Sequence, residues 1–299
     1  MLRRRSSVLV AVVLLTSGCA ASAPKQAVPP GRQNRASTST STTTGATTAP
    51  TPPATRPTSP ASQPGPGSDA TAAMAALDLY LQGIANRDSA QMLRYSTGAA
   101  AGLGSVRLTV AQVNQARGGT TTVAVTSESV SPSSVSAGAV TLSGTVQLRT
   151  EVKGSQGDQV STSTLSGPIQ LISVHGAWQV SDFRYDGAPM AFTPEGAQQT
   201  QGQVTLSVAF VLSYGQATAA LVGLGAASGS ASIALQQTSL VTQNGASETG
   251  QGIFTSTSRP TGVFTYARAG AVPTRLLASF KDSSSRPVNF DVALAGKPS

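Results

Sequence analysis

The chain has 299 residues, of which 11% are charged and 4% are aromatic, and its formal net charge is +8. Its single cysteine and single histidine exclude an intrachain disulfide, a cysteine-clustered zinc site and a two-histidine metal site. Seven of the 20 basic residues precede position 68, so the rest of the chain carries 13 basic and 12 acidic residues. This near neutrality argues against a nucleic-acid-binding face. No residue pattern indicates a metal or another cofactor.

Residues 1–18 are predicted to be a secretory signal peptide. Three arginines, Arg3 to Arg5, precede the apolar run 8–15, which is shorter than the roughly 20 residues needed to span a bilayer. The following Thr16-Ser17-Gly18-Cys19 resembles the lipobox of bacterial lipoproteins, although Thr16 replaces the usual leucine. The resemblance implies that Cys19 carries a diacylglyceryl group and anchors the chain in the lipid membrane, at the extracytoplasmic face of the bacterial cell membrane. The alternative is an ordinary signal peptide followed by an incidental cysteine.

Residues 19–68 are predicted to be a disordered tether. Residues 37–44 are all Ser or Thr, and seven prolines lie between positions 50 and 66. Such a segment has too little apolar surface to offset the entropy lost on ordering. Its proline content favours a partly extended spacer that holds the globular part away from the membrane.

A first globular body is expected over residues 69–190, and it begins with helices. Met74, Leu77, Leu81 and Ile84 recur at helical spacing. Asp88 followed by Gln91 is typical of a capping box and predicts a second, short helix. The glycine-rich segment 98–104 is expected to be a flexible loop.

Strands are predicted next. Period-two alternation marks residues 120–126, 139–152 and 159–165. Residues 165–186 predict a hairpin that turns at His175-Gly176, because glycine readily adopts the positive φ of a tight turn. Helices followed by an antiparallel meander predict an α+β fold with the helices on one face of the sheet.

Two segments of this body, LDLYLQGIANRDSAQMLRYS and ISVHGAWQVSDFRYD, resemble the nuclear-transport-factor/ketosteroid-isomerase-like superfamily. The resemblance implies a cone-shaped α+β domain, with a curved antiparallel sheet and N-terminal helices around an open mouth. Tyr80, Tyr95, Trp178 and Asp182 are the candidates for lining a ligand pocket. By residue type alone, Asp182, Tyr80, Tyr95 and Tyr185 are candidates for acid/base chemistry. The alternative for Trp178 is a core position. Members include both enzymes and binding modules, so the fold leaves the function open.

Residues 191–202 are predicted to be a linker, and residues 203–296 a second body. Short alternating runs separated by turn residues predict about seven strands, at 204–212, 217–223, 233–241, 252–256, 263–268, 275–281 and 287–294. This pattern predicts an all-β sandwich. It resembles the immunoglobulin-like modules of secreted actinobacterial lipoproteins, without the paired cysteines and core tryptophan of antibody-type domains.

Catalytic motifs are absent from the sequence. It contains no G-x-S-x-G, P-loop or G-x-G-x-x-G, and its single Ser-x-x-Lys, Ser22 to Lys25, lies in the predicted tether. We therefore expect a membrane-anchored cell-envelope lipoprotein that acts as a non-enzymatic binding or assembly module, with an envelope protein or a small apolar ligand as partner. The alternatives are an exported isomerase- or dehydratase-like enzyme that uses Asp182 or a tyrosine for acid/base chemistry, and a purely structural spacer. No catalytic residue is assigned.

Overall fold

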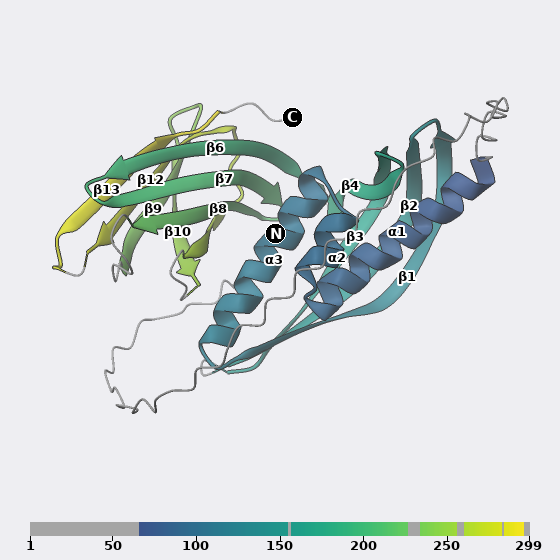
Figure 1. Ribbon diagram of the computed structural model, residues 1–299, viewed down its shortest axis with the longest axis horizontal. Helices are drawn as coiled ribbons and strands as arrows, with labels where there is room; N and C mark the ends of the chain where they lie inside the picture. The colour runs from purple at the N-terminus through teal and green to yellow at the C-terminus, as the bar shows by residue number, and fades with distance from the viewer. Residues whose placement is uncertain (1–65, 155–156, 227–233, 256–259, 283, 296–299) are drawn as a thin grey trace, which may run out of the picture. The chain divides into compact units, whose positions relative to one another are not determined.

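The computed structural model describes residues 66–154, 157–226, 234–255, 260–282 and 284–295. Pro64–Ser299 forms one compact unit. Within the described ranges the unit is mostly β-structure, with three helices on the N-terminal side and two sheets (Figure 1). Cys19, the predicted signal peptide and nearly all of the predicted tether lie outside the described residues.

The first two helices follow the predicted patterns closely. Helix α1 spans Pro66–Asn86, so it begins inside the segment assigned to the tether. It buries Leu77, Leu81 and Ile84 of the predicted apolar stripe, and Met74 is partly buried. Helix α2 spans Ser89–Arg94 and is capped by Asp88, whose Oδ1 accepts a hydrogen bond from Gln91 N at 3.0 Å. The Gln91 side chain donates to Leu79 O at 2.8 Å, so it ties α2 to α1 instead of completing a reciprocal capping box.

Helix α3 occupies Gly98–Ala116, and the loop expected at 98–104 is therefore wrong. The segment is rich in glycine and alanine, but it buries Ala100, Leu103 and Val106 on one face, and this tertiary burial outweighs a weak helix propensity. The helix contacts β1 and β4 of the first sheet and also several strands of the second sheet. It therefore lies between the two sheets.

The five-stranded sheet is an antiparallel meander in the order β1-β2-β3-β4-β5. The predicted hairpin is confirmed, because β3 and β4 flank a turn in which His175 and Gly176 both have positive φ, at 51° and 82°. The strand predicted at 159–165 and the first strand of the predicted hairpin form one continuous strand, β3. The bounds are β1 Thr120–Ser136, β2 Ala139–Lys153, β3 Gln159–Val174, β4 Ala177–Tyr185 and β5 Ala188–Pro189.

The second sheet has eight strands in the order β13-β12-β9-β10-β11-β8-β7-β6. All seven predicted strands are present among its members. The eighth, β6, lies where a linker was expected at 191–202, and it pairs with β7 across a register shift between Pro194 and Ala197. Turn-forming residues within a bulged strand misled the sequence interpretation. The bounds are β6 Ala191–Gln201, β7 Val204–Tyr214, β8 Ala217–Ala226, β9 Ala234–Thr242, β10 Ser247–Phe254, β11 Thr261–Ala267, β12 Pro273–Lys281 and β13 Pro287–Ala293.

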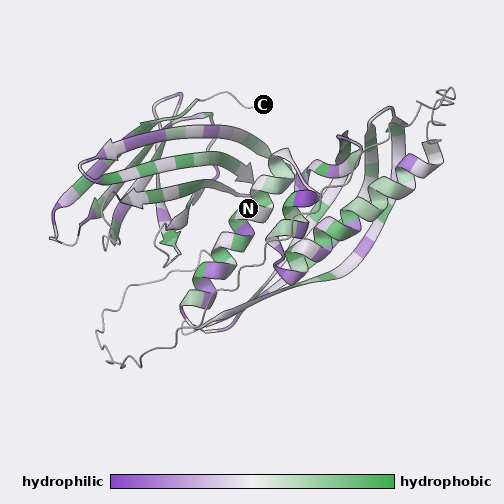
Figure 2. Cartoon of the chain, viewed as in Figure 1, coloured by the Kyte–Doolittle hydropathy of each residue, from purple (hydrophilic) through white to green (hydrophobic). Residues whose placement is uncertain are grey.

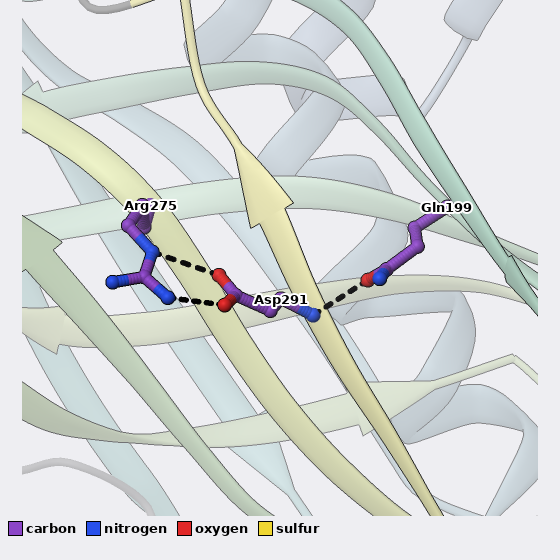
Figure 3. Close-up of polar contacts among 3 residues, drawn as sticks. All are labelled: Gln199, Arg275 and Asp291. Atoms are coloured by element: carbon purple, nitrogen blue, oxygen red, sulfur yellow. Dashed lines mark hydrogen bonds and ion pairs between the residues drawn. The ribbon is translucent and has the colours of Figure 1, made fainter.

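This sheet changes partner at β10, which pairs with β9 over residues 247–250 and with β11 over residues 251–254. A strand shared in this way forms a corner between two packed halves of a sheet. The outer strands β6 and β13 are then joined by a hydrogen bond from Asp291 N to the side chain of Gln199, with Oε1 at 2.6 Å (Figure 3). Just beyond β13, Ala295 N donates to Glu195 Oε2 of β6 at 2.7 Å. Arg275 of the neighbouring strand β12 donates hydrogen bonds to both carboxylate oxygens of Asp291. The result is one nearly closed barrel instead of the predicted sandwich.

Two hydrophobic cores stabilise the unit. The barrel interior contains Phe264, Phe280 and Phe290, with centroid separations of 6.4 Å and 5.8 Å along that series. The other core lies around the helices and includes Phe210 and Leu212 of β7. Hydrophobic positions accordingly recur along α3 and along the strands beside it (Figure 2). The expected boundary between two separate bodies at 191–202 is thus crossed by a shared core.

Candidate functional site

Tyr80 of α1 is a core residue in the structure. It has no exposed surface, and its hydroxyl donates to Ala100 O of α3 at 2.9 Å. Its ring centroid lies 6.4 Å from that of Phe183 on β4. Burial raises the pKa of Tyr80 well above its ordinary value, against an opposing effect of Arg107. The side chain therefore stays neutral and ties α1 to α3.

Tyr95, Trp178 and Asp182 lie on or beside β4. The backbone of Tyr95 accepts a hydrogen bond from Val180 N at 2.9 Å, which docks the α2–α3 connection on the edge of β4. Trp178 is half-buried against the helix-side core. No hydrogen bond or ring contact joins Tyr80, Tyr95, Trp178 and Asp182 to one another within the described part of the chain.

Asp182 occupies a strand bulge. Consecutive residues of β3 pair with Asp182 and Val180, so one extra residue is inserted in β4. The Asp182 carboxylate accepts a hydrogen bond from Phe183 N at 2.8 Å. Burial raises the pKa of Asp182, and this hydrogen bond opposes the shift. The local backbone therefore explains the position of this carboxylate.

A polar cluster that the sequence interpretation missed surrounds Arg107 of α3. One terminal nitrogen of its guanidinium donates to Ser163 Oγ at 2.8 Å and to the Tyr185 hydroxyl at 2.7 Å. The other donates to Thr150 Oγ1 at a longer 3.4 Å. The acceptors come from β2, β3 and β4, so Arg107 connects α3 to three adjacent strands. We call Arg107, Thr150, Ser163 and Tyr185 the Arg107 cluster.

The register explains why these side chains converge. Leu165 pairs with Tyr185, and Ser163 precedes Leu165 by two residues, so all three point to the same face of the sheet. Leu165 is buried in the helix-side core. The hydroxyls of Ser163 and Tyr185 therefore point toward α3, where Arg107 meets them.

Aromatic rings flank the cluster. The guanidinium carbon of Arg107 lies 5.6 Å from the Tyr185 ring centroid, within the range of a cation–π interaction. Tyr185 in turn packs edge-to-face on Tyr214 of β7, with centroids 5.4 Å apart. Burial raises the pKa of Tyr214 to about 12, with Tyr185 adding to the shift and Arg107 opposing it. Residues of α3 and of both sheets therefore meet at this point.

The cluster carries a positive charge without a carboxylate partner in the described ranges. The ion pairs found there are Arg149–Glu151, Arg275–Asp291 and Arg286–Asp282, and none involves Arg107. Arg107 is half-buried, and a charge removed from water is costly unless it is paired. Each hydroxyl that accepts from Arg107 still has its own hydrogen to donate. Such an arrangement can hold a negatively charged group.

A separate hollow of about 270 Å³ lies beside α3 and contains none of the predicted pocket residues. It is lined by Asn86, Arg87, Leu108, Ala111, Gln112 and Gln115. Among the described residues, no three acidic, histidine or cysteine side chains gather as a metal site would require. None of the three described helices is both long and apolar enough to cross a bilayer.

Comparison with known proteins gives no identification: no family model, curated protein or solved structure matches this chain. The Arg107 cluster could be found from sequence only by recognising α3. Leu103, Val106, Val110 and Val113 recur at helical spacing. Arg107 is the single arginine within this helical segment, and its place beside the apolar stripe is the sequence signal for the cluster.

Proposed function

We propose that the protein is an exported lipoprotein, held at the extracytoplasmic face of the cell membrane by a lipid on Cys19. The observation that carries this proposal is the order of features at the N-terminus. An arginine-rich start and a short apolar run lead to small residues directly before the sole cysteine. An exported chain with one cysteine cannot pair it internally, and lipidation gives that thiol a role.

A diacylglyceryl anchor is strong enough for this purpose. Each buried methylene contributes about 0.8 kcal/mol, so two acyl chains hold firmly where one binds only reversibly. The following low-complexity segment, rich in Ser, Thr and Pro, would supply distance between the membrane and the compact unit. We place the five-stranded sheet and α1–α3 in the cone-shaped α+β class, a placement supported by helices packed on one face of an antiparallel meander.

We propose further that the compact unit binds or assembles with another molecule and does not turn over a substrate. The Arg107 cluster supports binding, because a guanidinium fixed by three hydroxyls can orient an anionic group. Of the acid/base candidates, Tyr80 and Asp182 bond to backbone groups and lie on different elements. Neither arrangement provides a base held against an open site.

Membrane fractionation and mass spectrometry of the mature protein test the anchoring. We expect the native chain in the membrane fraction, with a diacylglyceryl-modified N-terminal residue at position 19. Cys19→Ala should move the protein out of that fraction, because the acceptor sulfur is lost. Ser22→Ala, three residues further along, is the matched control and should stay membrane-bound. A Cys19→Ala variant that remains in the membrane fraction would refute the lipoprotein proposal.

A further inference from the structure

We infer that the Arg107 cluster binds the carboxylate of a small ligand with an aromatic or apolar body. This inference rests on the proposed binding function and names the class of ligand. It concerns a site formed by α3, β2, β3 and β4, with Tyr214 of β7 beside it.

The first argument is charge balance. The Arg107 guanidinium is permanently positive, and every partner it has among the described residues is a neutral hydroxyl. The nearby Tyr80 and Tyr214 do not supply a negative charge, since burial raises the pKa of both. One carboxylate would neutralise the site.

The second argument is donor supply. A guanidinium has five N–H groups, and three are used in the bonds to Thr150, Ser163 and Tyr185. The hydroxyls that accept these bonds can donate their own hydrogens to a further acceptor. A carboxylate oxygen at the cluster could therefore receive hydrogen bonds from both Arg107 and a neighbouring hydroxyl. Charge-assisted bonds of this kind are about twice as strong as neutral ones.

The third argument selects a carboxylate over a phosphate. A phosphate monoester approaches two negative charges at neutral pH, and the cluster offers one cation, so part of the charge would remain uncompensated in a half-buried place. The rings of Tyr185 and Tyr214, each half-buried, offer apolar surface next to the cation. A carboxylate joined to an aromatic or apolar group uses both features.

Binding by the purified full chain tests this inference, with benzoate as the probe and acetate, phosphate and chloride compared at equal ionic strength. Isothermal titration and the thermal unfolding midpoint report binding, because a ligand that binds only the folded state raises that midpoint. We expect saturable protection by benzoate, weaker protection by acetate, and none by phosphate beyond that of chloride.

Variants locate the binding. Arg107→Gln should weaken benzoate binding about tenfold or more, the range expected for one charged hydrogen bond. Tyr185→Phe keeps the ring and should weaken it less. Arg117→Gln is the matched control, an exposed arginine at the C-terminal end of the same helix, and it should bind like the native chain. If Arg107→Gln fails to fold, Arg107→Lys keeps the charge but loses the planar fork, and it should still bind more weakly.

Three outcomes would overturn the inference: phosphate binding as tightly as benzoate, undiminished binding by the Arg107 and Tyr185 variants, or no saturable binding by any carboxylate. None of these measurements depends on the lipid at Cys19. If fractionation showed the native chain to be unlipidated and outside the membrane, the anchoring proposal would fail, and benzoate binding through Arg107 would still support this one.

Discussion

The two halves of the compact unit satisfy their polar groups in different ways. In the barrel of β6–β13, charged side chains pair with each other, as Arg275 does with Asp291 (Figure 3). Arg286 pairs with Asp282 in the same way. The buried Thr238 and Tyr266 hydroxyls also pair, at 2.6 Å. In the helix-side layer of α1–α3 and β1–β5, the hydrogen-bond partners of Arg107 among the described residues are all hydroxyls. Two of the three ion pairs in the described ranges lie in the barrel, whereas Arg107 of the helix-side layer holds a charge that a ligand can complete.

The two halves also share a strand, β7, whose side chains enter both hydrophobic cores. β7 contributes Leu206 and Val208 to the barrel interior, and Phe210 and Leu212 to the helix-side core. A register shift between Val208 and Phe210 lets the same strand serve both. A filled barrel of this kind is a rigid support, and its outer face positions α3, which carries Arg107. We expect perturbations in the barrel to be felt in the helix-side layer.

Phe280→Ala is the strongest test of this coupling. Phe280 is fully buried and its ring contacts Phe254, Phe264 and Phe290. Removing a buried phenyl ring costs about 3–5 kcal/mol of unfolding free energy. Urea unfolding should be followed by circular dichroism and by the fluorescence of Trp178, the sole tryptophan, which lies on β4. Both signals should shift to lower urea together.

The control for Phe280→Ala is Val160→Ala, at a side chain that is 59% exposed on β3. Surface substitutions of this kind usually change stability by less than about 0.5 kcal/mol. If Phe280→Ala shifted the circular-dichroism transition to lower urea and left the Trp178 fluorescence transition at its native urea concentration, the halves would be independent domains. The shared core would then not couple them.

Gly83→Ala tests the packing of the helix-side layer. A Cβ at Gly83 of α1 would lie 2.7 Å from the backbone nitrogen of Met92 on α2, so one helix must move. Alanine gains about 1 kcal/mol of helix propensity over glycine, but overpacking costs about 1–3 kcal/mol. The backbone cannot yield as a side-chain tip can, and we expect a net loss of stability in urea unfolding.

Gly67→Ala is the matched control, because a Cβ there meets no atom within 4 Å and Gly67 lies in the same helix. That variant should be as stable as the native chain or slightly more so. Equal stability of Gly83→Ala and Gly67→Ala would show that α1 and α2 pack less closely than the structure indicates.

Local patterns predicted the fold well where one face of an element is buried. The α1 stripe, the Asp88 cap and the His175-Gly176 hairpin each depend on a few neighbouring residues. Helix α3 was missed because small residues such as Gly102 and Gly104 carry little periodic signal, although they admit Phe192 and Met92 closely. β6 was missed because Pro194 and Gly196 are typical of turns. The closure of the barrel depends on the distant pair β6 and β13, which local patterns do not report.

The candidate site was predicted poorly for a related reason. Aromatic and acidic residue types drew attention to Tyr80, Tyr95, Trp178 and Asp182, which the structure does not join into one site. Tyr185 was named by type, but its partner Arg107 lies 78 residues earlier in the chain. A site assembled from α3 and three strands becomes visible only when the register of the sheet is known.

The smallest predicted effect concerns a pair of carboxyl groups on the helix-side layer. Burial raises the pKa of Glu128 on β1, and the charge of Asp78 on α1 adds to the shift. A raised pKa means that the folded state binds the proton more tightly than the unfolded state. Stability from this group is therefore greatest in acid and falls as the pH rises through the interval between the unfolded and folded pKa values.

Glu128→Gln removes that penalty, so it should raise the thermal midpoint slightly at neutral pH and leave it nearly unchanged in acid, where Glu128 is already protonated. Salt should shrink the gain, because Glu128 is exposed and screened. Glu151→Gln is the control, since Glu151 faces the Arg149 guanidinium at 2.8 Å and loses an attractive contact. A gain in the thermal midpoint at neutral pH in both variants would show that the net charge of the protein, and not the surroundings of Glu128, determines the gain. A gain confined to Glu128→Gln would assign it to the local surroundings of Glu128, which are its burial and the nearby Asp78 charge.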